Sequence, residues 1–337
     1  MRLVILLAGG SIANLTAIVT AREAHQIKAR YIEKTVIYLS SQAHHCIEKA
    51  IRIAGLQESV QRILPLDNQF RIIPEEFEKM VVEDISSGLK PFMVIASAGT
   101  TDVGAVDPLK EIGQIARDYG LWYHVDAAYG GFFLLTEYGK KIMEGIEMSD
   151  SVVMDPHKGL FLPYGLGVVL VKNVNALKKA HNYQANYMQD ALQSADELSP
   201  ADLSPELTKP FRGLRLWLPL KLHGLKPFRA ALDEKLLLAQ YFYSEIQKVP
   251  GFEVGPEPEL SVVTYRYIPR NADANEFNKK LVEAVQLDGR VFISSTILNG
   301  KFTLRLAVLS FRTHLKTIDT LILVLKEKAG ELDKGQV

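Results

Sequence analysis

The residues with the clearest chemical potential lie in Ser151–Leu160, where Asp155, His157 and Lys158 follow a short apolar run. The run, Ser151–Met154, predicts a buried strand that ends at a proline. A lysine just beyond such a strand lies at the mouth of a sheet, where open α/β sheets bind ligands. Its amine can there lose a proton and attack a carbonyl carbon to form a Schiff base. We therefore expect Lys158 to be a nucleophile, although most lysines are solvated surface residues.

A second group of polar residues belongs to the apolar run Leu121–Val125, which also predicts a strand. Because alternate residues of a strand share a face, His124 and Asp126 are expected to point the same way. Two alanines follow Asp126 and leave room for another group to approach. A buried carboxylate is costly unless it is paired with a cation or a hydrogen-bond donor. Taken singly, Asp126 could cap a helix, and His124 and His157 could be core histidines.

A third group is the glycine turn Gly9–Ser11, which opens onto a helical pattern over Ile12–Val19. Ser11 is the expected N-cap of that helix. Free backbone N–H groups and the positive end of the helix dipole make such a turn suitable for a phosphate. Another strand-end turn, Ala98–Thr101, follows the apolar run Phe92–Ala96.

Together these groups match the needs of pyridoxal 5'-phosphate (PLP): an anion site, a carboxylate for the ring nitrogen and an amine for the aldehyde. A metal fits less well, because His44 and His45 are adjacent and no His/Cys cluster has ligand spacing. We therefore expect no metal site. A nicotinamide cofactor also fits less well, since no Gly-x-Gly-x-x-Gly follows a strand.

The elements that must position these residues alternate along the chain. Apolar runs typical of buried strands are Val36–Leu39, Arg62–Leu66, Phe92–Ala96, Leu121–Val125 and Ser151–Met154. Helical patterns lie between them at Cys46–Ala54, Pro74–Asp84 and Pro108–Tyr119. The strands begin roughly thirty residues apart, which is the length of a βα unit. We therefore predict an α/β fold with a mostly parallel sheet and helices on both faces.

The second half of the chain departs from this rhythm. A strand at Gly165–Val171 precedes a polar stretch, Asn182–Lys209, which is interpreted as a long loop, of a length that is usually functional or disordered. The elements expected after it are helices at Leu214–Leu225, Phe228–Gln247, Ala274–Leu287 and Leu315–Ala329, and strands at Ser261–Tyr267, Val291–Ser295 and Phe302–Leu309. We predict a large domain, residues 1–218, and a smaller C-terminal α+β domain, residues 219–337.

Composition narrows the classes of protein. The chain has 337 residues, 47% of them hydrophobic, with 39 basic and 39 acidic side chains. A net charge of zero argues against a nucleic-acid partner and gives no support to a membrane surface. The single cysteine, Cys46, excludes an internal disulfide and fits a reducing compartment. The apolar run Leu3–Ala8 is too short for a secretory signal, so a cytoplasmic protein is expected.

With these motifs in view, the sequence resembles the group II PLP-dependent decarboxylases, the family of aromatic amino acid, glutamate and histidine decarboxylases. The matching motifs are Gly-Gly-Ser11-Ile-Ala-Asn-Leu, Ser-Gln-Ala-His44, Ala-Gly-Thr-Thr101, His124-Val-Asp126-Ala-Ala-Tyr, Asp-Pro-His157-Lys158, Asn-Tyr187-Met-Gln-Asp, Pro210-Phe-Arg212-Gly-Leu-Arg-Leu-Trp217 and Leu304-Arg305-Leu-Ala. They come in family order and span nearly the whole chain. The resemblance implies the fold-type I architecture of aspartate aminotransferase, a homodimer, and decarboxylation of an L-amino acid.

The resemblance also implies a role for each matching residue. Lys158 would form the Schiff base with PLP, and Asp126 would pair with the ring nitrogen. His44 would stack on the ring and help to place the substrate carboxylate, and Tyr187 would protonate the carbanion after carbon dioxide leaves. The residues that would contact the cofactor are Gly10, Ser11, His44, Thr101, Asp126, Ala128, Asp155, His157 and Lys158.

The sequence departs from the family pattern in three places. Family members have a substantial segment before the glycine turn, which lines the substrate pocket, so an N-terminally truncated member is expected, with exposed apolar surfaces where that segment would pack. Gly159 stands where many members have tryptophan, and His45 where the aromatic enzymes tend to have serine. The substrate amino acid is therefore left open. The alternatives are another PLP reaction (an aminotransferase, a carbon–carbon lyase or a desulfurase) or a chain with little or no activity.

Overall fold

The fold is built around a seven-stranded sheet in a computed structural model that describes residues 3–182 and 199–334. Its strands lie in the order β1-β7-β6-β5-β4-β2-β3. Their bounds are β1 Leu3–Leu7, β2 Thr35–Ser40, β3 Val60–Leu64, β4 Lys90–Ser97, β5 Trp122–Asp126, β6 Ser151–Met154 and β7 Gly167–Val171. The five strands from β3 to β6 are parallel, which confirms the predicted α/β class with a mostly parallel sheet.

The remaining edge of the sheet is antiparallel. Strand β7 runs antiparallel to β6, and β1 runs antiparallel to β7. The sequence analysis did not identify β1, because its five residues resemble any short apolar run. In the structure Ile5 and Leu7 are buried and Val4 is exposed, which is the alternation of an edge strand with one covered face.

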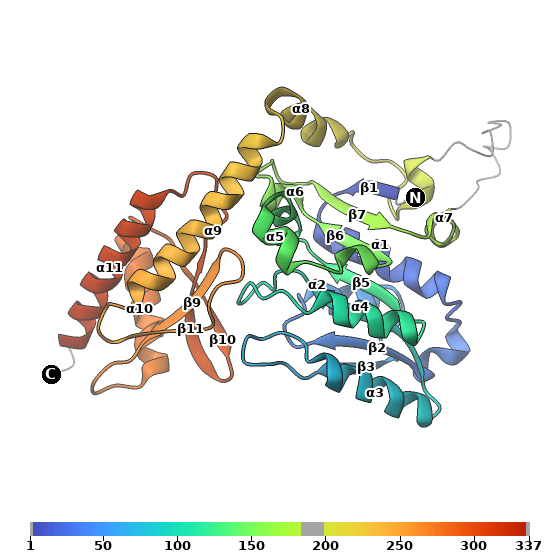
Figure 1. Cartoon of the computed structure of the whole chain (residues 1–337), viewed down its shortest axis with the longest axis horizontal. Coiled ribbons are helices and arrows are strands. Elements are labelled where there is room, and N and C mark those ends of the chain that lie inside the picture. The colour runs from blue at the N-terminus through green and yellow to red at the C-terminus, as the bar shows by residue number, and fades with distance from the viewer. Residues whose placement is uncertain (1–2, 183–198, 335–337) are drawn as a thin grey trace.

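Helices cover both faces of this sheet, as Figure 1 shows. Their bounds are α1 Gly10–Ala24, α2 Cys46–Ile53, α3 Pro74–Ser86, α4 Leu109–Asp118, α5 Glu137–Ile142, α6 Pro156–Gly159 and α7 Val174–His181, with short 3-10 helices at Ala29–Lys34, Gly131–Leu135, Ile146–Met148 and Pro200–Leu203. Neighbouring residues of a strand enter different cores: Ile37 packs with α1 and α2, whereas Tyr38 packs with α3. A strand buried on both faces accounts for the continuous apolar runs in the sequence.

The C-terminal part forms a second, antiparallel sheet in the order β10-β11-β9-β8. Its elements are α8 Gly213–His223, α9 Lys226–Ile246, β8 Phe252–Val254, β9 Val262–Tyr267, α10 Ala274–Asp288, β10 Ser294–Leu298, β11 Lys301–Ala307 and α11 Leu315–Lys334. The helices α9, α10 and α11 share one core with this sheet. Strand β8 was missed because three residues are too few to show a period.

The predicted boundary between residues 218 and 219 falls inside α8 and stays a prediction. Helix α9 follows it and joins the two parts, since Leu232 packs in the core of the large sheet and Leu238 in the core of the small one (Figure 1). Within residues 3–182 and 199–334, no helix combines the length and apolar character needed to cross a membrane.

The topology brings the carboxyl ends of several strands to one edge of the large sheet. Strands β4, β5 and β6 are parallel neighbours, so their last residues, Ser97, Asp126 and Met154, lie at the same edge. Because β7 runs the other way, its first residue, Gly167, meets the turn that leaves β1. A Cβ atom at Gly167 would lie 2.5 Å from the Cα of Gly9. The glycine turn therefore rests directly on β7.

Gly167→Ala should push this turn off the sheet. We expect a loss of about 1–3 kcal/mol in the free energy of unfolding, the usual cost of an overpacked site, measured by urea denaturation. Gly330→Ala is the matched control, because Gly330 lies in α11 with nothing within 4 Å of its added Cβ. That variant should gain up to about 1 kcal/mol from helix propensity. A Gly167→Ala protein as stable as the wild type would contradict the contact.

Candidate active site

A cavity of about 340 Å³ opens at the edge where β4, β5 and β6 end. Nine of the ten predicted site residues line it: Gly10, Ser11, His44, Thr101, Asp126, Ala128, Asp155, His157 and Lys158. The tenth, Tyr187, lies outside the described residues. The structure therefore brings α1, β5, α6 and the loops that carry His44, Thr101 and Ala128 to one opening, while the roles of the residues stay predictions.

Ser11 is not the N-cap of α1, and that prediction was wrong. Gly9 is the N-cap, and the helix begins at Gly10. A Cβ atom at Gly10 would lie 2.9 Å from Oδ2 of Asp155, so only glycine lets the helix start this close to the strand ends. Ser11 is left exposed in the first turn, on the cavity wall. Because first-turn N–H groups have no partner inside a helix, α1 offers backbone donors there.

Asp155 is the ion-pair partner of Lys158. The Lys158 Nζ donates to Asp155 Oδ2 at 3.1 Å, with 37% of the lysine side chain exposed and 2% of the aspartate. Burial raises the pKa of Asp155, although the Lys158 ammonium acts in the opposite direction. The carboxylate therefore lies within reach of the lysine proton and has an increased affinity for it.

His157 is held by its backbone surroundings. Its Nδ1 lies 2.7 Å from the carbonyl oxygen of Leu166, and because a carbonyl only accepts, Nδ1 must carry a proton and donate it. The other ring nitrogen, Nε2, lies 3.6 Å from Asp155 Oδ2. The ring also lies next to the first glycine, since a Cβ on Gly9 would be 3.5 Å from His157 Cε1. His157 thus stands beside the N-terminus of α1.

Asp126 is the second buried carboxylate of the cavity, with 8% of the residue exposed. Its Oδ1 accepts from the backbone N–H of Ala128 at 3.0 Å, and its Oδ2 accepts from Asn14 Nδ2 at 3.0 Å. Among the ion pairs of the described residues, none includes Asp126. Two neutral donors therefore fix this carboxylate and leave its charge without a cation.

His44 also lines the cavity, as a half-buried neutral ring. Its Nδ1 accepts from the backbone N–H of Cys46 at 3.2 Å, so its proton is on Nε2. Burial lowers the pKa of His44, and the neighbouring His45 lowers it further. The two rings lie 4.0 Å apart between centroids. A neutral imidazole of fixed tautomer suits contact with an aromatic ring.

Sequence reasoning missed several residues that line the cavity, among them Gln42, Cys46 and Ser97. The most informative is Asn14, which is completely buried in α1. A polar residue on the apolar face of a predicted helix was the available indication. Burial raises the pKa of the Cys46 thiol to about 11, so it stays neutral.

The cavity wall at Thr100 and Thr101 belongs to a loop that the C-terminal part holds at both ends. Arg305 of β11 donates to the carbonyl oxygens of Asp102, at 2.9 Å, and of Thr101. Ser261, just before β9, bonds to the Tyr129 hydroxyl at 2.7 Å. The small sheet is therefore attached to the wall of the cavity.

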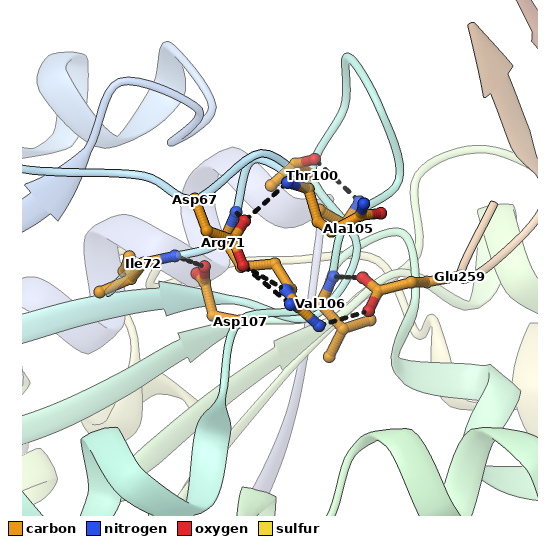
Figure 2. Close-up of polar contacts among 9 residues, drawn as sticks. Asp67, Arg71, Ile72, Thr100, Ala105, Val106, Asp107 and Glu259 are labelled. Carbon is orange, nitrogen blue, oxygen red and sulfur yellow. Dashed lines mark hydrogen bonds and ion pairs between the residues drawn. The ribbon is translucent and has the colours of Figure 1, made fainter. Parts of the chain in front are cut away.

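Figure 2 shows the other end of this loop, where two carboxylates pair with Arg71 and a third, Asp107, bonds to the backbone. Glu259 accepts from the Val106 N–H at 2.7 Å and pairs with Arg71 at 3.3 Å. Asp67 also pairs with Arg71, at 2.8 Å. Asp107 is buried and accepts from the backbone N–H of Ile72 at 2.8 Å. This cluster joins the loop to both parts of the molecule.

Asp107 also accepts from the N–H of Ser97, the last residue of β4, at 2.7 Å. Burial raises the pKa of Asp107 to about 7, even though two backbone donors act in the opposite direction. Burial raises the pKa of Glu259 as well. The folded state therefore holds these protons more tightly than the unfolded chain does.

Comparisons with known proteins agree with this geometry. The family model of the pyridoxal-dependent decarboxylase conserved domain matches residues 4–268. The chain is 36% identical over 330 residues to an aromatic-L-amino-acid decarboxylase of Bacillus atrophaeus, covering 96% of this chain and 68% of that one. It is 30% identical over 328 residues to a phenylacetaldehyde synthase of Arabidopsis thaliana, with 95% and 67% covered.

The fold matches as well. The solved structure of Oryza sativa TDC with PLP and tryptamine superimposes with a TM-score of 0.92 at 25% identity, covering 98% of this chain and 71% of that one. The chain thus spans about two thirds of the length of the two enzymes and somewhat more of the rice protein.

The carboxylate cluster predicts how stability depends on pH. The folded-state pKa of Asp107 is raised from 3.8 to about 7, so between these values the folded state binds more protons and the free energy of unfolding falls as pH rises. Asp107→Asn should make this fall smaller and should also cost about 1–3 kcal/mol at acid pH, because one backbone N–H loses its acceptor.

Urea unfolding at acid and neutral pH measures both effects. Asp118→Asn, which alters an exposed carboxylate on α4, is the control and should leave the fall unchanged. An Asp107→Asn protein with the wild-type pH dependence would show that Asp107 does not titrate in this range.

Proposed function

Because this chain belongs to the pyridoxal-dependent decarboxylase family, we propose that it removes the carboxyl group of an L-amino acid as carbon dioxide, with PLP as cofactor and Lys158 as nucleophile. The observation that carries the proposal is the meeting of Lys158, Asp126 and the N-terminus of α1 at one cavity. These are the amine, the carboxylate and the anion site that the cofactor requires.

The residues present fit PLP. Within the described part of the chain, Oδ1 of Asp155 is buried without a hydrogen-bond partner and is available as an acceptor. No cation of the described residues pairs with the buried Asp126, which is costly unless a charged group completes the site. The first turn of α1 supplies backbone donors suited to a phosphate, with His157 beside it. When bound, PLP supplies a protonated ring that accepts the electron pair left as carbon dioxide departs.

Each side chain then has a separate task. Lys158 would hold the aldehyde carbon of the cofactor through Nζ, and Asp155 Oδ2, at 3.1 Å, is placed to receive the proton that this amine must release. Asp126 would hold the ring nitrogen in its charged form, because a nearby carboxylate favours the cation. His44 would contact the ring from the cavity wall. The same residues, on a rigid sheet edge, keep the reacting groups oriented.

Tyr187 is proposed as the acid that returns a proton to the α-carbon. This rests on the sequence, since Tyr187 lies outside the described residues. The resemblance favours tyrosine for amine formation, because the aldehyde synthases of the family carry phenylalanine there. At Gly159, where many family members have tryptophan, a Cβ atom would lie 2.7 Å from Phe132 Cβ, so this backbone leaves no room for a larger residue.

We further propose a cytoplasmic homodimer. The support for the dimer is α8, in which no residue is buried although most are apolar. Leu214, Trp217 and Leu222 are 49%, 57% and 68% exposed. An apolar surface of this kind marks an interaction site. A second copy of the chain is the partner that the resemblance indicates, and the single cysteine fits a reducing cytoplasm.

The decisive test of the activity is the fate of Lys158. The protein incubated with PLP should develop a visible absorbance, and borohydride should fix the cofactor onto the peptide that contains Lys158, as read by mass spectrometry. Carbon dioxide release over a panel of L-amino acids should be abolished in Lys158→Ala, because no other amine lines the cavity among the described residues.

Lys110→Ala, which removes an exposed lysine on α4, is the matched control and should behave as the wild type. Tyr187→Phe should lower the amine yield while retaining the borohydride product. Transfer of nitrogen to a keto acid without gas would replace decarboxylation by another PLP reaction, and a fully active Lys158→Ala protein would refute the proposal.

The dimer has its own test. Leu214→Ser combined with Trp217→Ser should shift the sedimentation coefficient from a dimer to a monomer. Because neither residue is buried in the monomer, unfolding of the monomer should change by no more than about 0.5 kcal/mol. Leu287→Ser, in α10 and 87% exposed, is the control and should stay dimeric. A wild type that sediments as a monomer would contradict this assembly.

A further inference from the structure

Behind Asp126 lies a continuous line of buried hydrogen bonds that the mechanism above does not use. Trp122 Nε1 lies 2.9 Å from Ser151 Oγ, and Ser151 Oγ lies 2.8 Å from His124 Nδ1. His124 Nε2 lies 2.8 Å from Asn14 Oδ1, and Asn14 Nδ2 lies 3.0 Å from Asp126 Oδ2. The three central residues, Asn14, His124 and Ser151, are at most 1% exposed.

Elementary donor and acceptor rules fix the direction of this chain. An ionised carboxylate only accepts, so the amide nitrogen of Asn14 faces Asp126 and the amide oxygen faces His124. An amide oxygen only accepts, so His124 must carry a proton on Nε2. An indole nitrogen only donates, so Trp122 donates to Ser151. The Ser151 hydroxyl is then free to donate to His124 Nδ1, and every proton in the chain points towards Asp126.

The same assignment satisfies every polar atom involved. The second amide proton of Asn14 reaches Cys46 Sγ, at 3.4 Å. A neutral His124 with the proton on Nε2 has one donor and one acceptor, and both are used. Burial lowers the pKa of His124 to about 4, so the ring stays neutral at physiological pH. The chain thus delivers donors to the carboxylate without delivering a positive charge.

That distinction matters because the two aspartates of the cavity are treated differently. Asp155 has the Lys158 ammonium at 3.1 Å. The donors that the described residues offer to Asp126 are both neutral, the amide of Asn14 and the backbone of Ala128. A protonated His124 would be a cation separated from Asp126 only by the side chain of Asn14. Its charge would compete with a cationic ring for the same carboxylate.

We propose that Asn14, His124 and Ser151 are positioning residues that hold Asp126 as an oriented, unneutralised anion for the ring nitrogen of the cofactor. The inference rests on the proposed function and deepens it. Asn14 lines the cavity, whereas His124 and Ser151 lie behind it; each of the three would act through Asp126. Breaking the chain should therefore weaken recognition of the ring nitrogen specifically, and leave contacts with the phosphate and the aldehyde intact.

A pair of probes isolates that effect: PLP, and its 1-deaza analogue, in which a C–H group replaces the ring nitrogen. The wild-type protein should bind PLP about tenfold more tightly or better, the usual range for a hydrogen bond to a charged group. Asn14→Leu and Ser151→Ala should reduce the ratio of the two affinities to near one, mainly by weakening the binding of PLP. Damage to folding alone would weaken both probes equally, and would overturn the inference.

The matched control is Thr20→Val. Thr20 is buried in α1, as Asn14 is. Its hydroxyl donates to the Thr16 carbonyl oxygen, which is not part of the line of hydrogen bonds from Trp122 to Asp126. It should keep the wild-type preference. A Ser151→Ala protein that also keeps the wild-type preference would refute the inference.

A second measurement needs neither activity nor added cofactor. Nitrogen NMR of the imidazoles in the wild-type protein should show His124 neutral, with its proton on Nε2, from about pH 5.5 to about pH 8. A His124 that titrates in this range, or carries its proton on Nδ1, would overturn the inference. If the wild type binds neither probe, the proposed function fails. The NMR result still decides whether His124 has the neutral state and the tautomer that the line of hydrogen bonds requires.

Discussion

The arrangement of this site depends on the burial of two carboxylates at the ends of neighbouring parallel strands. Asp126 ends β5, and Asp155 directly follows β6. The negative charge of each carboxylate makes ionisation of the other less favourable, and Asp126 accordingly acts to raise the pKa of Asp155. Two buried charges of the same sign persist only where each has its own partners. The surrounding elements can be understood as the supply of those partners.

The partners come from different directions. Lys158 reaches back to Asp155 from one turn of α6, and α1 brings the backbone donors of its first turn and the side chain of Asn14. The helix can lie this close only because Gly10 has no side chain where Asp155 Oδ2 lies. The antiparallel β7 in turn supports the glycine turn. The reversal of strand direction at the edge of the sheet is thus part of how the charges are accommodated.

Much of this could be predicted from the sequence, and the exceptions have physical reasons. The parallel strands could be predicted because strands buried on both faces are uniformly apolar. Their carboxyl ends lie at one edge of the sheet, which predicted the position of the site. Local patterns do not contain distances between segments. Asn14 was therefore overlooked, although its bond to Asp126 spans 112 residues of sequence. The same limit applies to Glu259, which acts on a loop 153 residues away. Ser11 was wrongly predicted as the N-cap because the close approach of Gly10 to Asp155, not the capping preference of serine, sets the start of α1.

The different support of the two aspartates fits the tasks proposed for them. Asp155, the proposed acceptor of the Lys158 proton, has the ammonium at 3.1 Å as the donor, and its burial raises its affinity for that proton. A carboxylate that must stabilise a cation arriving with a cofactor would lose that capacity beside a resident cation. Neutral donors avoid this loss, because a hydrogen bond from a neutral group fixes the orientation of the carboxylate without cancelling its negative charge. The sequence His-Val-Asp achieves both requirements with one strand: period-two geometry places His124 and Asp126 on the same face, where a single asparagine from α1 can bond to both.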